Sequence, residues 1–335
     1  MKATGLLEKQ ATQSDQVLRI ENLHVEYRSG GGIAKAVNGV NLTLHKGEAV
    51  GLVGESGAGK TTTALSILNL LPEGTGYITK GDIWFNNESV LKKSETELNK
   101  MRGGQIGMVF ANPLTSLNPV FTIGHQVAMV LMKHRGIKEK QANETVKQLL
   151  EMVGIPGARL NDYPYQLSGG MRQRVGIIAA LACSPQLLIA DEPTTALDVT
   201  IQAQILELMK KLQAEYASSL LMITHNLGII SELCQRVAIM YGGEIVEYGS
   251  VREIFTAPKH WYTYGLLHAI PKLTGPRETL EALPGLVANA QNLPAGCKFH
   301  ERCSHCLEKC KSQIPPMFKI TDNHSVACWD VEGQV

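Results

Sequence analysis

Residues 54–61, GESGAGKT, form the part of the sequence with the clearest chemical meaning. They fit the phosphate-binding pattern G-x-x-x-x-G-K-[ST], directly after an apolar segment typical of a buried strand and at the start of a predicted helix. Glycines let backbone N–H groups face phosphate oxygens, and the helix N-terminus adds positive partial charge. We expect Lys60 to reach the β- and γ-phosphates and the Thr61 hydroxyl to ligate Mg²⁺. The residues predicted to contact the nucleotide here are Gly54, Glu55, Ser56, Gly57, Ala58, Gly59, Lys60, Thr61 and Thr62.

Two adjacent carboxylates end a second apolar segment, LLIADEP at residues 187–193. Such a pair would be costly to bury without a partner. In a nucleoside triphosphatase the first, Asp191, would hold Mg²⁺, often through water, and the second, Glu192, would orient and deprotonate the attacking water. Taken alone, the pair could equally be a structural feature at a helix N-terminus. Together with the phosphate-binding loop, it indicates hydrolysis.

A third motif, LSGGMRQR at residues 167–174, places a serine and two glycines at the start of a helix, which is typical of an anion-binding helix N-terminus. It resembles the signature sequence of ATP-binding-cassette (ABC) ATPases. The resemblance implies that Ser168, Gly169 and Gly170 close over a nucleotide held by a partner subunit. Two such domains would then sandwich two ATP molecules head to tail.

Three further positions follow the same family in order. The resemblance implies that Tyr27 stacks on adenine, although it could also be an ordinary strand aromatic. Residues 196–198 (Ala-Leu-Asp) resemble the D-loop, so Asp198 is expected to contact the opposite subunit. His225, in ITHN, resembles the switch histidine that senses the γ-phosphate and helps to position the water.

The likeness narrows to the dipeptide and oligopeptide branch of the peptide/nickel importers. It rests on PLTSLNP (113–119), residues 191–205 and the cysteine-rich tail, and it covers residues 17–330. It implies an ATP-binding and hydrolysing subunit that powers import of di- or oligopeptides from the cytoplasmic face of the cell membrane. The implied partners are a second ABC ATPase subunit, two transmembrane permease subunits and, indirectly, an extracytoplasmic peptide-binding protein. Dipeptides, longer peptides, glutathione and nickel chelates remain open as cargo.

Two residues depart from the family pattern. Ala111 stands where a glutamine usually helps to coordinate Mg²⁺ and the attacking water, and Asn226 stands where aspartate is usual. A methyl group can do neither task, so we expect slower or poorly coupled hydrolysis at this site. Two other interpretations remain. The chain could be a regulatory half of an ATPase pair with a degenerate nucleotide site, or a soluble ABC ATPase of DNA repair or translation. The single cassette and the absence of a coiled-coil pattern count against the second.

Composition limits the remaining possibilities. The 335 residues include 32 basic and 31 acidic side chains, a net charge of +1, which does not favour a nucleic-acid surface. No apolar run reaches the ~18–20 residues that cross a bilayer. The N-terminus is polar and lacks a secretory apolar region. We therefore expect a peripheral cytoplasmic protein.

Five of the seven cysteines lie within residues 297–335. Four thiolates suit either a [4Fe–4S] cluster or tetrahedral zinc, whereas disulfides are disfavoured in the cytosol. Some members of the resembled family carry a cluster here, so a cluster is the preferred expectation, with zinc or free thiols as alternatives. The candidate ligands are Cys297, Cys303, Cys310 and Cys328, with Cys306 as an extra thiol.

The predicted elements must bring these motifs together. Strands alternating with helices indicate an α/β domain with a mainly parallel sheet. The expected fold is an ABC-type P-loop ATPase with an antiparallel β subdomain, a helical subdomain and a small cysteine-rich tail. The expected ranges are a flexible N-terminus at 1–16, a nucleotide-binding domain at 17–265 with a helical subdomain at about 112–180, and a linker and tail at 266–335. Within the domain, the helix after the phosphate-binding loop is expected to run from about Lys60 to Pro72.

Overall fold

The computed structural model describes residues 15–112, 116–194, 198–269 and 283–333. Most of the predicted flexible N-terminus, the first residues of PLTSLNP, residues 196 and 197 of the predicted D-loop and much of the predicted linker lie outside these ranges. Within the described residues, no helix is long and apolar enough to cross a membrane.

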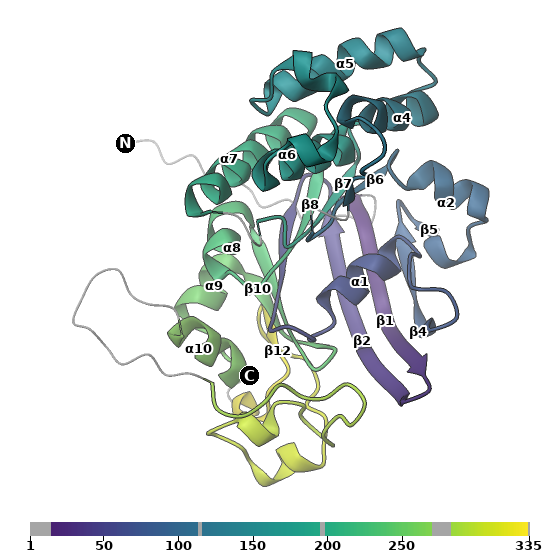
Figure 1. Cartoon of the computed structure of the whole chain (residues 1–335). Helices are drawn as coiled ribbons and strands as arrows, with labels where there is room; N and C mark the ends of the chain where they lie inside the picture. The colour runs from purple at the N-terminus through teal and green to yellow at the C-terminus, as the bar shows by residue number, and fades with distance from the viewer. Residues whose placement is uncertain (1–14, 113–115, 195–197, 270–282, 334–335) are drawn as a thin grey trace, which may run out of the picture.

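A four-stranded antiparallel sheet comes first along the chain, with strand order β2-β1-β4-β5 (Figure 1). Its apolar alternation places residues such as Val25 and Val40 in the core while their neighbours face solvent. The strands are β1 (Gln16–Ser29), β2 (Gly32–His45), β4 (Gly76–Phe85) and β5 (Glu88–Ser89). This sheet confirms the predicted antiparallel portion.

An eight-stranded mixed sheet forms the centre of the molecule, with order β11-β12-β10-β9-β3-β8-β7-β6. The strands β9, β3, β8, β7 and β6 run parallel, and their near-continuous apolar sequences are buried on both faces. The strands are β3 (Ala49–Val53), β6 (Ile106–Val109), β7 (Leu187–Asp191), β8 (Ser219–Thr224), β9 (Arg236–Tyr241), β10 (Glu244–Ser250), β11 (Phe318–Thr321) and β12 (His324–Val326).

Helices cover this sheet and build a separate layer beyond its β6 and β7 edge (Figure 1). In that layer α4, α5 and α6 share a buried apolar cluster that includes Val127, Val146 and Val175. The helices are α1 (Lys60–Ile67), α2 (Glu95–Met101), α4 (Ile123–Arg135), α5 (Glu139–Met152), α6 (Gly169–Leu181), α7 (Val199–Tyr216), α8 (Leu227–Leu233), α9 (Val251–Thr256) and α10 (Trp261–His268).

The helix α1 is shorter than the sequence predicts, because it ends at Ile67 and not near Pro72. Leu68 caps it, and Asn69 takes a left-handed conformation with φ of 50°. The Leu70 N–H then bonds back to the Leu65 carbonyl. Asparagine tolerates this conformation better than most residues, so it stops the helix before the proline does.

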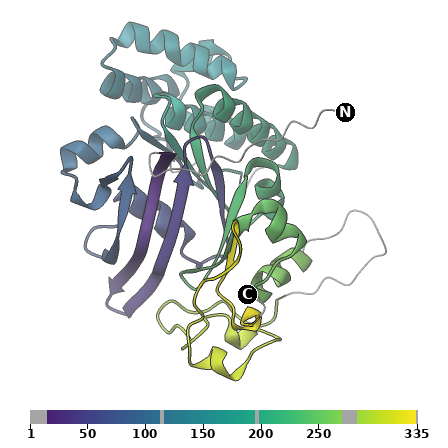
Figure 2. The same ribbon diagram turned by 180° about the vertical axis from the view of Figure 1, so that it is seen from behind.

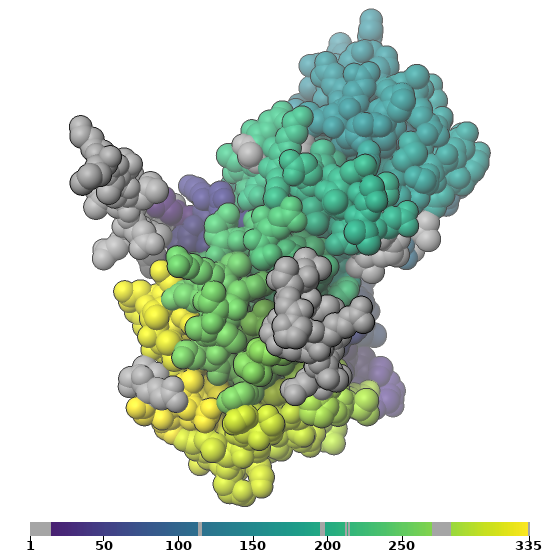
Figure 3. Space-filling view, turned by 90° about the vertical axis from the view of Figure 1, so that its left-hand side faces the viewer, coloured from purple at the N-terminus to yellow at the C-terminus, as the bar shows by residue number. Residues whose placement is uncertain are grey.

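The C-terminal region is attached directly to the central sheet. The β12 strand pairs with β10, where Glu247 lies opposite Val326 (Figure 2). His324 of β12 makes a buried hydrogen bond with Glu247, with 2.7 Å between Nε2 and Oε1. The space-filling view shows this region continuing the surface formed by α9 and α10 (Figure 3).

Candidate nucleotide-binding and catalytic site

Three neighbouring parallel strands deliver the predicted motifs to one edge of the central sheet. Strand β8 lies between β3 and β7, and all three end at the same side because they are parallel. The phosphate-binding loop follows β3, Asp191 and Glu192 end β7, and His225 follows β8. Sites in open α/β sheets form at this carboxyl edge.

The phosphate-binding loop is packed too closely for side chains at two of its glycines. A Cβ on Gly54 would lie 2.2 Å from the Met240 carbonyl oxygen, and one on Gly59 would lie 2.3 Å from that of Ala36. Gly59 also has a φ of 102° at the start of α1, and no side chain caps the helix there. The first backbone N–H groups of α1 therefore stay available for an anion.

Lys60 lies buried at the start of α1 and folds back over the loop. Its Nζ donates to the carbonyl oxygens of Gly54, at 2.7 Å, and Glu55, at 3.0 Å. Burial lowers the pKa of Lys60, while the nearby carboxylates of Glu192 and Asp191 favour its charged form. The ammonium group is thus held at the loop between the phosphate-binding backbone and the acidic strand end.

Asp191 is the residue best suited to a hard cation. It is 3% exposed, and burial raises its pKa although the Thr61 hydroxyl hydrogen-bonds to it. Its Oδ1 atom has no hydrogen-bond partner among the described residues. An unsatisfied buried carboxylate oxygen is costly, and Mg²⁺ prefers oxygen ligands. The structure therefore places the two predicted Mg²⁺ ligands, Thr61 and Asp191, side by side.

Glu192 adopts an unusual backbone conformation next to the predicted switch histidine. Its φ is 44°, and its N–H donates to the Ile223 carbonyl at 2.8 Å. The His225 Nδ1 lies 3.2 Å from Glu192 Oε1. A left-handed glutamate costs of order 1–3 kcal/mol, and such strain clusters at functional sites.

Of the remaining predicted residues, Tyr27 lies near the phosphate-binding loop, whereas the others lie at exposed or half-buried positions apart from it. The Tyr27 hydroxyl lies 3.2 Å from the Thr62 hydroxyl, which places the tyrosine of β1 beside the start of α1. Ser168 caps α6 by accepting a bond from the Met171 N–H at 3.3 Å. Ser168 and Gly169 are exposed, as is Asp198 before α7, and in the described chain no hydrogen bond joins them to the phosphate-binding loop.

Sequence reasoning missed two supports of the loop that come from distant segments. The Glu55 N–H donates to the Tyr262 hydroxyl of α10 at 2.9 Å. The Glu55 carboxylate accepts two bonds from Arg302, Nη1 to Oε2 at 2.6 Å and Nη2 to Oε1 at 3.1 Å. No local pattern marks either residue, because both act across more than 200 positions of sequence.

The four predicted cysteine ligands line one small cavity near α10. All are free thiols, and the Cys297 N–H donates to the Cys310 carbonyl at 2.9 Å. Burial raises the pKa of Cys297 to about 12 and those of Cys303 and Cys328 to about 11. Across the described ranges, no three or more His, Cys, Asp or Glu side chains are arranged to hold a metal ion. The cavity does not include Cys306.

The strand-end geometry defines a P-loop nucleoside triphosphatase. Two family models match the sequence: "ABC transporter" at residues 37–195, and "Oligopeptide/dipeptide transporter, C-terminal region" at residues 246–310.

Individual proteins agree with these matches. A putative peptide import ATP-binding protein of Brucella ovis is 47% identical over 325 residues, which cover 93% of this chain and 96% of the relative. The oligopeptide transport ATP-binding protein OppD of Bacillus subtilis is 47% identical over 317 residues, which cover 94% and 88%. A solved dimeric ATP-binding cassette, MJ0796, bound to ADP and phosphate, superposes with a TM-score of 0.63 at 31% identity and covers 70% of this chain and 99% of that one. The chain belongs to the ATP-binding proteins of ABC transporters, and it is an ATPase.

Proposed function

We propose that this chain is the ATPase subunit of an importer for dipeptides or oligopeptides. The observation that carries the proposal is the second family match, at residues 246–310, which is specific to oligopeptide/dipeptide transporters and lies outside the general ABC match. Relatives aligned over nearly the whole chain are named for oligopeptide and dipeptide transport.

Each site residue then has a chemical role. Lys60 and the loop backbone bind the β- and γ-phosphates, and Thr61 and Asp191 hold Mg²⁺, which neutralises phosphate charge when bound. Glu192 takes a proton from water as the water oxygen attacks the γ-phosphorus. The bond from that phosphorus to the β–γ bridging oxygen breaks, which yields ADP and phosphate. His225, 3.2 Å from Glu192, positions this carboxylate and senses the γ-phosphate.

The exposed motif residues belong to the contact with a second ATPase subunit. Ser168, Gly169 and Gly170 at the start of α6 close over the nucleotide of that subunit, and Asp198 contacts it nearby. Tyr27 stacks on the adenine of this chain's own nucleotide. A Cβ on Gly170 would lie 2.7 Å from the Ile201 side chain, so a larger residue there would displace Ile201 of α7.

The chain works at the cytoplasmic face of the membrane as a peripheral subunit. Its partners are a second ABC ATPase, two transmembrane permeases and, indirectly, an extracytoplasmic peptide-binding protein. We assign residues 17–265 to the nucleotide-binding domain, about 112–180 to its helical subdomain and 266–335 to the linker and tail. Nucleotide-driven closure of the ATPase pair moves the permeases, and hydrolysis resets them.

The cysteine cavity is lined by Cys297, Cys303, Cys310 and Cys328, the donor type of a [4Fe–4S] cluster, although in the described structure no three such side chains are arranged to hold a metal ion. Its free volume is about 10 Å³, roughly the space of one water molecule, so binding a cluster requires the thiols to move apart. A brown chromophore that is lost on chelation or oxidation would support the cluster. A colourless protein with stoichiometric zinc would contradict it.

Transport is tested in native membranes. We expect mild-detergent purification of this chain to retain two multi-span proteins and a second ABC ATPase, and vesicles to take up labelled dipeptide or oligopeptide only with ATP. Glu192→Gln should abolish that uptake. Co-purification of only soluble partners, ribosomes or DNA would leave the ATPase chemistry intact and overturn the import proposal.

A further inference from the structure

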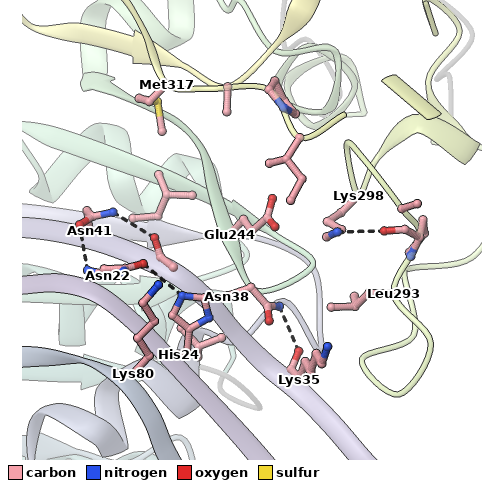
Figure 4. A pocket seen from close by; sticks show the side chains of 18 of the residues that line it. Asn22, His24, Lys35, Asn38, Asn41, Lys80, Glu244, Leu293, Lys298 and Met317 are labelled. Atoms are coloured by element: carbon pink, nitrogen blue, oxygen red, sulfur yellow. Dashed lines mark hydrogen bonds between the residues drawn. The ribbon is translucent and has the colours of Figure 1, made fainter. Parts of the chain in front are cut away.

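A groove of about 780 Å³ lies between the antiparallel sheet and the C-terminal region (Figure 4). One wall comes from β1, β2 and β4, and the other from residues 293–298 and 314–317. Glu244, the first residue of β10, lies between these walls. None of the predicted nucleotide-site residues lines the groove, and its volume lies in the range of small-molecule sites.

The charged side chains of the groove have few partners of opposite charge. Within the described chain, the Glu244 carboxylate accepts no hydrogen bond and forms no ion pair, and Lys35 and Lys80 have no carboxylate partner. Lys298 is the cation that acts on Glu244, but its Nζ is bonded to the carbonyls of Pro294 and Gly296 at 2.9 and 3.3 Å.

Burial makes this carboxylate sensitive to what enters the groove. Burial raises the pKa of Glu244 to about 7, although the charge of Lys298 acts to lower it. The other titratable groups that line the groove are Glu26, His24, Lys35 and Lys80, and burial lowers the pKa of His24. A cationic ligand group near Glu244 would stabilise its ionised form.

The groove also has apolar and amide surfaces. Ile314 and Met317 are 59% and 47% exposed on the C-terminal wall, although both are large apolar side chains. Asn22, Asn38 and Asn41 present amides from the antiparallel sheet. Figure 4 shows the amides of Asn22 and Asn41 on the side of the groove opposite Lys298.

We propose that this groove binds a small zwitterion with an apolar side chain, that is, a free amino acid or a short peptide. Its ammonium group pairs with Glu244, its carboxylate with Lys80, and its side chain packs on Ile314 and Met317. An inorganic anion would meet the carboxylates of Glu26 and Glu244, and a divalent cation would meet the lysines, so neither suits the mixture of charges.

The groove adjoins the phosphate-binding loop through the turn between β9 and β10. The Gly243 N–H donates to the Ala58 carbonyl of that loop at 3.1 Å. Asn38 holds the same turn, because its N–H donates to the Gly243 carbonyl at 2.8 Å and its side chain donates to that of Gly242 at 2.9 Å. A ligand on Glu244 would thus sit beside a turn that is bonded to the loop, and any effect it has on nucleotide affinity is matched by an equal effect of nucleotide on ligand affinity.

Calorimetric titration of the purified full chain tests the binding. The probes are L-leucine and leucyl-leucine; leucinamide and N-acetyl-leucine are analogues that lack one charge, and inorganic phosphate is a free anion without an apolar group. We expect saturable 1:1 binding of at least one zwitterion, and binding at least tenfold weaker for each analogue. Because no transport is involved, the result does not depend on the import proposal.

Variants locate the site. Glu244→Gln and Lys80→Met should each weaken binding at least tenfold, whereas Glu139→Gln and Lys140→Met, exposed on α5, should leave it unchanged. Lys80 is exposed, so its substitution gives a second test of the site that leaves the buried Glu244 in place. No saturable binding of either zwitterion, equal binding of phosphate or N-acetyl-leucine, or binding unaffected by Lys80→Met would each overturn the proposal.

The link to the nucleotide site has its own measurement. The titration is repeated with saturating Mg-ADP, and ADP is titrated with and without leucyl-leucine. We expect Mg-ADP to change the affinity for leucyl-leucine, and leucyl-leucine to change the affinity for ADP by the same factor. Equal affinities in the presence and absence of the second ligand would show that the groove binds without acting on the phosphate-binding loop.

Discussion

Arg302 and Glu55 form a two-pronged ion pair that joins the C-terminal region to the phosphate-binding loop, with bonds of 2.6 and 3.1 Å. Arg302 is held in place by further bonds to the Pro284 carbonyl and the Tyr241 hydroxyl. A bidentate pair of this kind restricts the orientation of both the guanidinium and the carboxylate. The C-terminal region therefore helps to set the conformation of the phosphate-binding loop.

Replacing this arginine should weaken both the fold and nucleotide binding. We expect Arg302→Met to lower the free energy of unfolding by about 2–3 kcal/mol, since Glu55 loses a charged partner in a half-buried setting. ADP affinity should fall several-fold. Arg302→Lys should recover only part of each effect, because lysine cannot form the paired geometry. Denaturant unfolding measures the change in the free energy of unfolding, and titration with fluorescent ADP measures the change in affinity.

A matched control is Lys309→Met, which removes a surface ion pair with Glu332. Such pairs contribute about 0–1 kcal/mol. Unchanged ADP affinity in Arg302→Met would show that the ion pair does not shape the loop.

Glu192→Gln should separate nucleotide binding from hydrolysis. The amide keeps the size of the side chain but cannot accept a proton, so we expect ATP turnover to fall by roughly 10²- to 10⁴-fold while ATP affinity is kept. Phosphate release and ATP titration are the measurements, with the exposed Glu207→Gln of α7 as control. Turnover within twofold of the parent would remove Glu192 from the catalytic role.

Ala111→Gln should raise ATP turnover several-fold. Val109 of β6 pairs with Ala190 of β7, so Ala111 follows its strand at the same edge as Asp191 and Glu192. An amide there could reach Mg²⁺ or the attacking water, which a methyl group cannot. Steady-state turnover with the partner ATPase present decides the matter, and no gain would contradict the expectation.

Asn226 is predicted to matter for stability and not for chemistry. Its side chain caps α8 by accepting the Gly228 N–H at 2.9 Å. Aspartate caps helices equally well, so Asn226→Asp should leave stability nearly unchanged, whereas Asn226→Ala should lower it by about 1 kcal/mol. Thermal and denaturant unfolding measure this. A large gain in turnover with Asn226→Asp would instead give the position a catalytic role.

Glu244 should make stability depend on pH near neutrality. Its folded-state pKa of about 7 lies above the usual 4.5, so the folded chain binds the proton more tightly than the unfolded chain. Its contribution is therefore favourable at low pH and is lost as pH rises through 7, by up to about 3 kcal/mol. We expect Glu244→Gln to stabilise the chain at pH 8.5 and to have little effect at pH 4, below the unfolded-state pKa of 4.5. Equal effects at both pH values would contradict this.

Local sequence was sufficient for the strand ends and for the residues placed there. Thr61 and Asp191, or Glu192 and His225, meet because apolar strands and the motifs that follow them are both local signals, and parallel strands share one carboxyl edge. The end of α1 was misplaced because a left-handed Asn69 acts before Pro72, and a residue preference for that conformation is a weak signal.

Contacts across the chain could not be predicted in the same way. Tyr262 and Arg302 contact Glu55 from segments more than 200 residues away, and the sequence next to each of them contains no motif that predicts this contact. The four cysteines were found by spacing, yet their arrangement around one cavity depends on how residues 283–333 fold against α10. Side-chain identity gives candidates, and tertiary packing selects among them.

The pairing of β12 with β10 gives the C-terminal region a protective task. Without it, β10 would become the border of the central sheet, with unpaired backbone groups open to a neighbouring molecule. Glu247 would lose its His324 partner at the same time. A chain cut short before His324 would thus be prone to self-association through that exposed edge. In the intact chain, the ATPase domain and the tail should melt together as one cooperative unit.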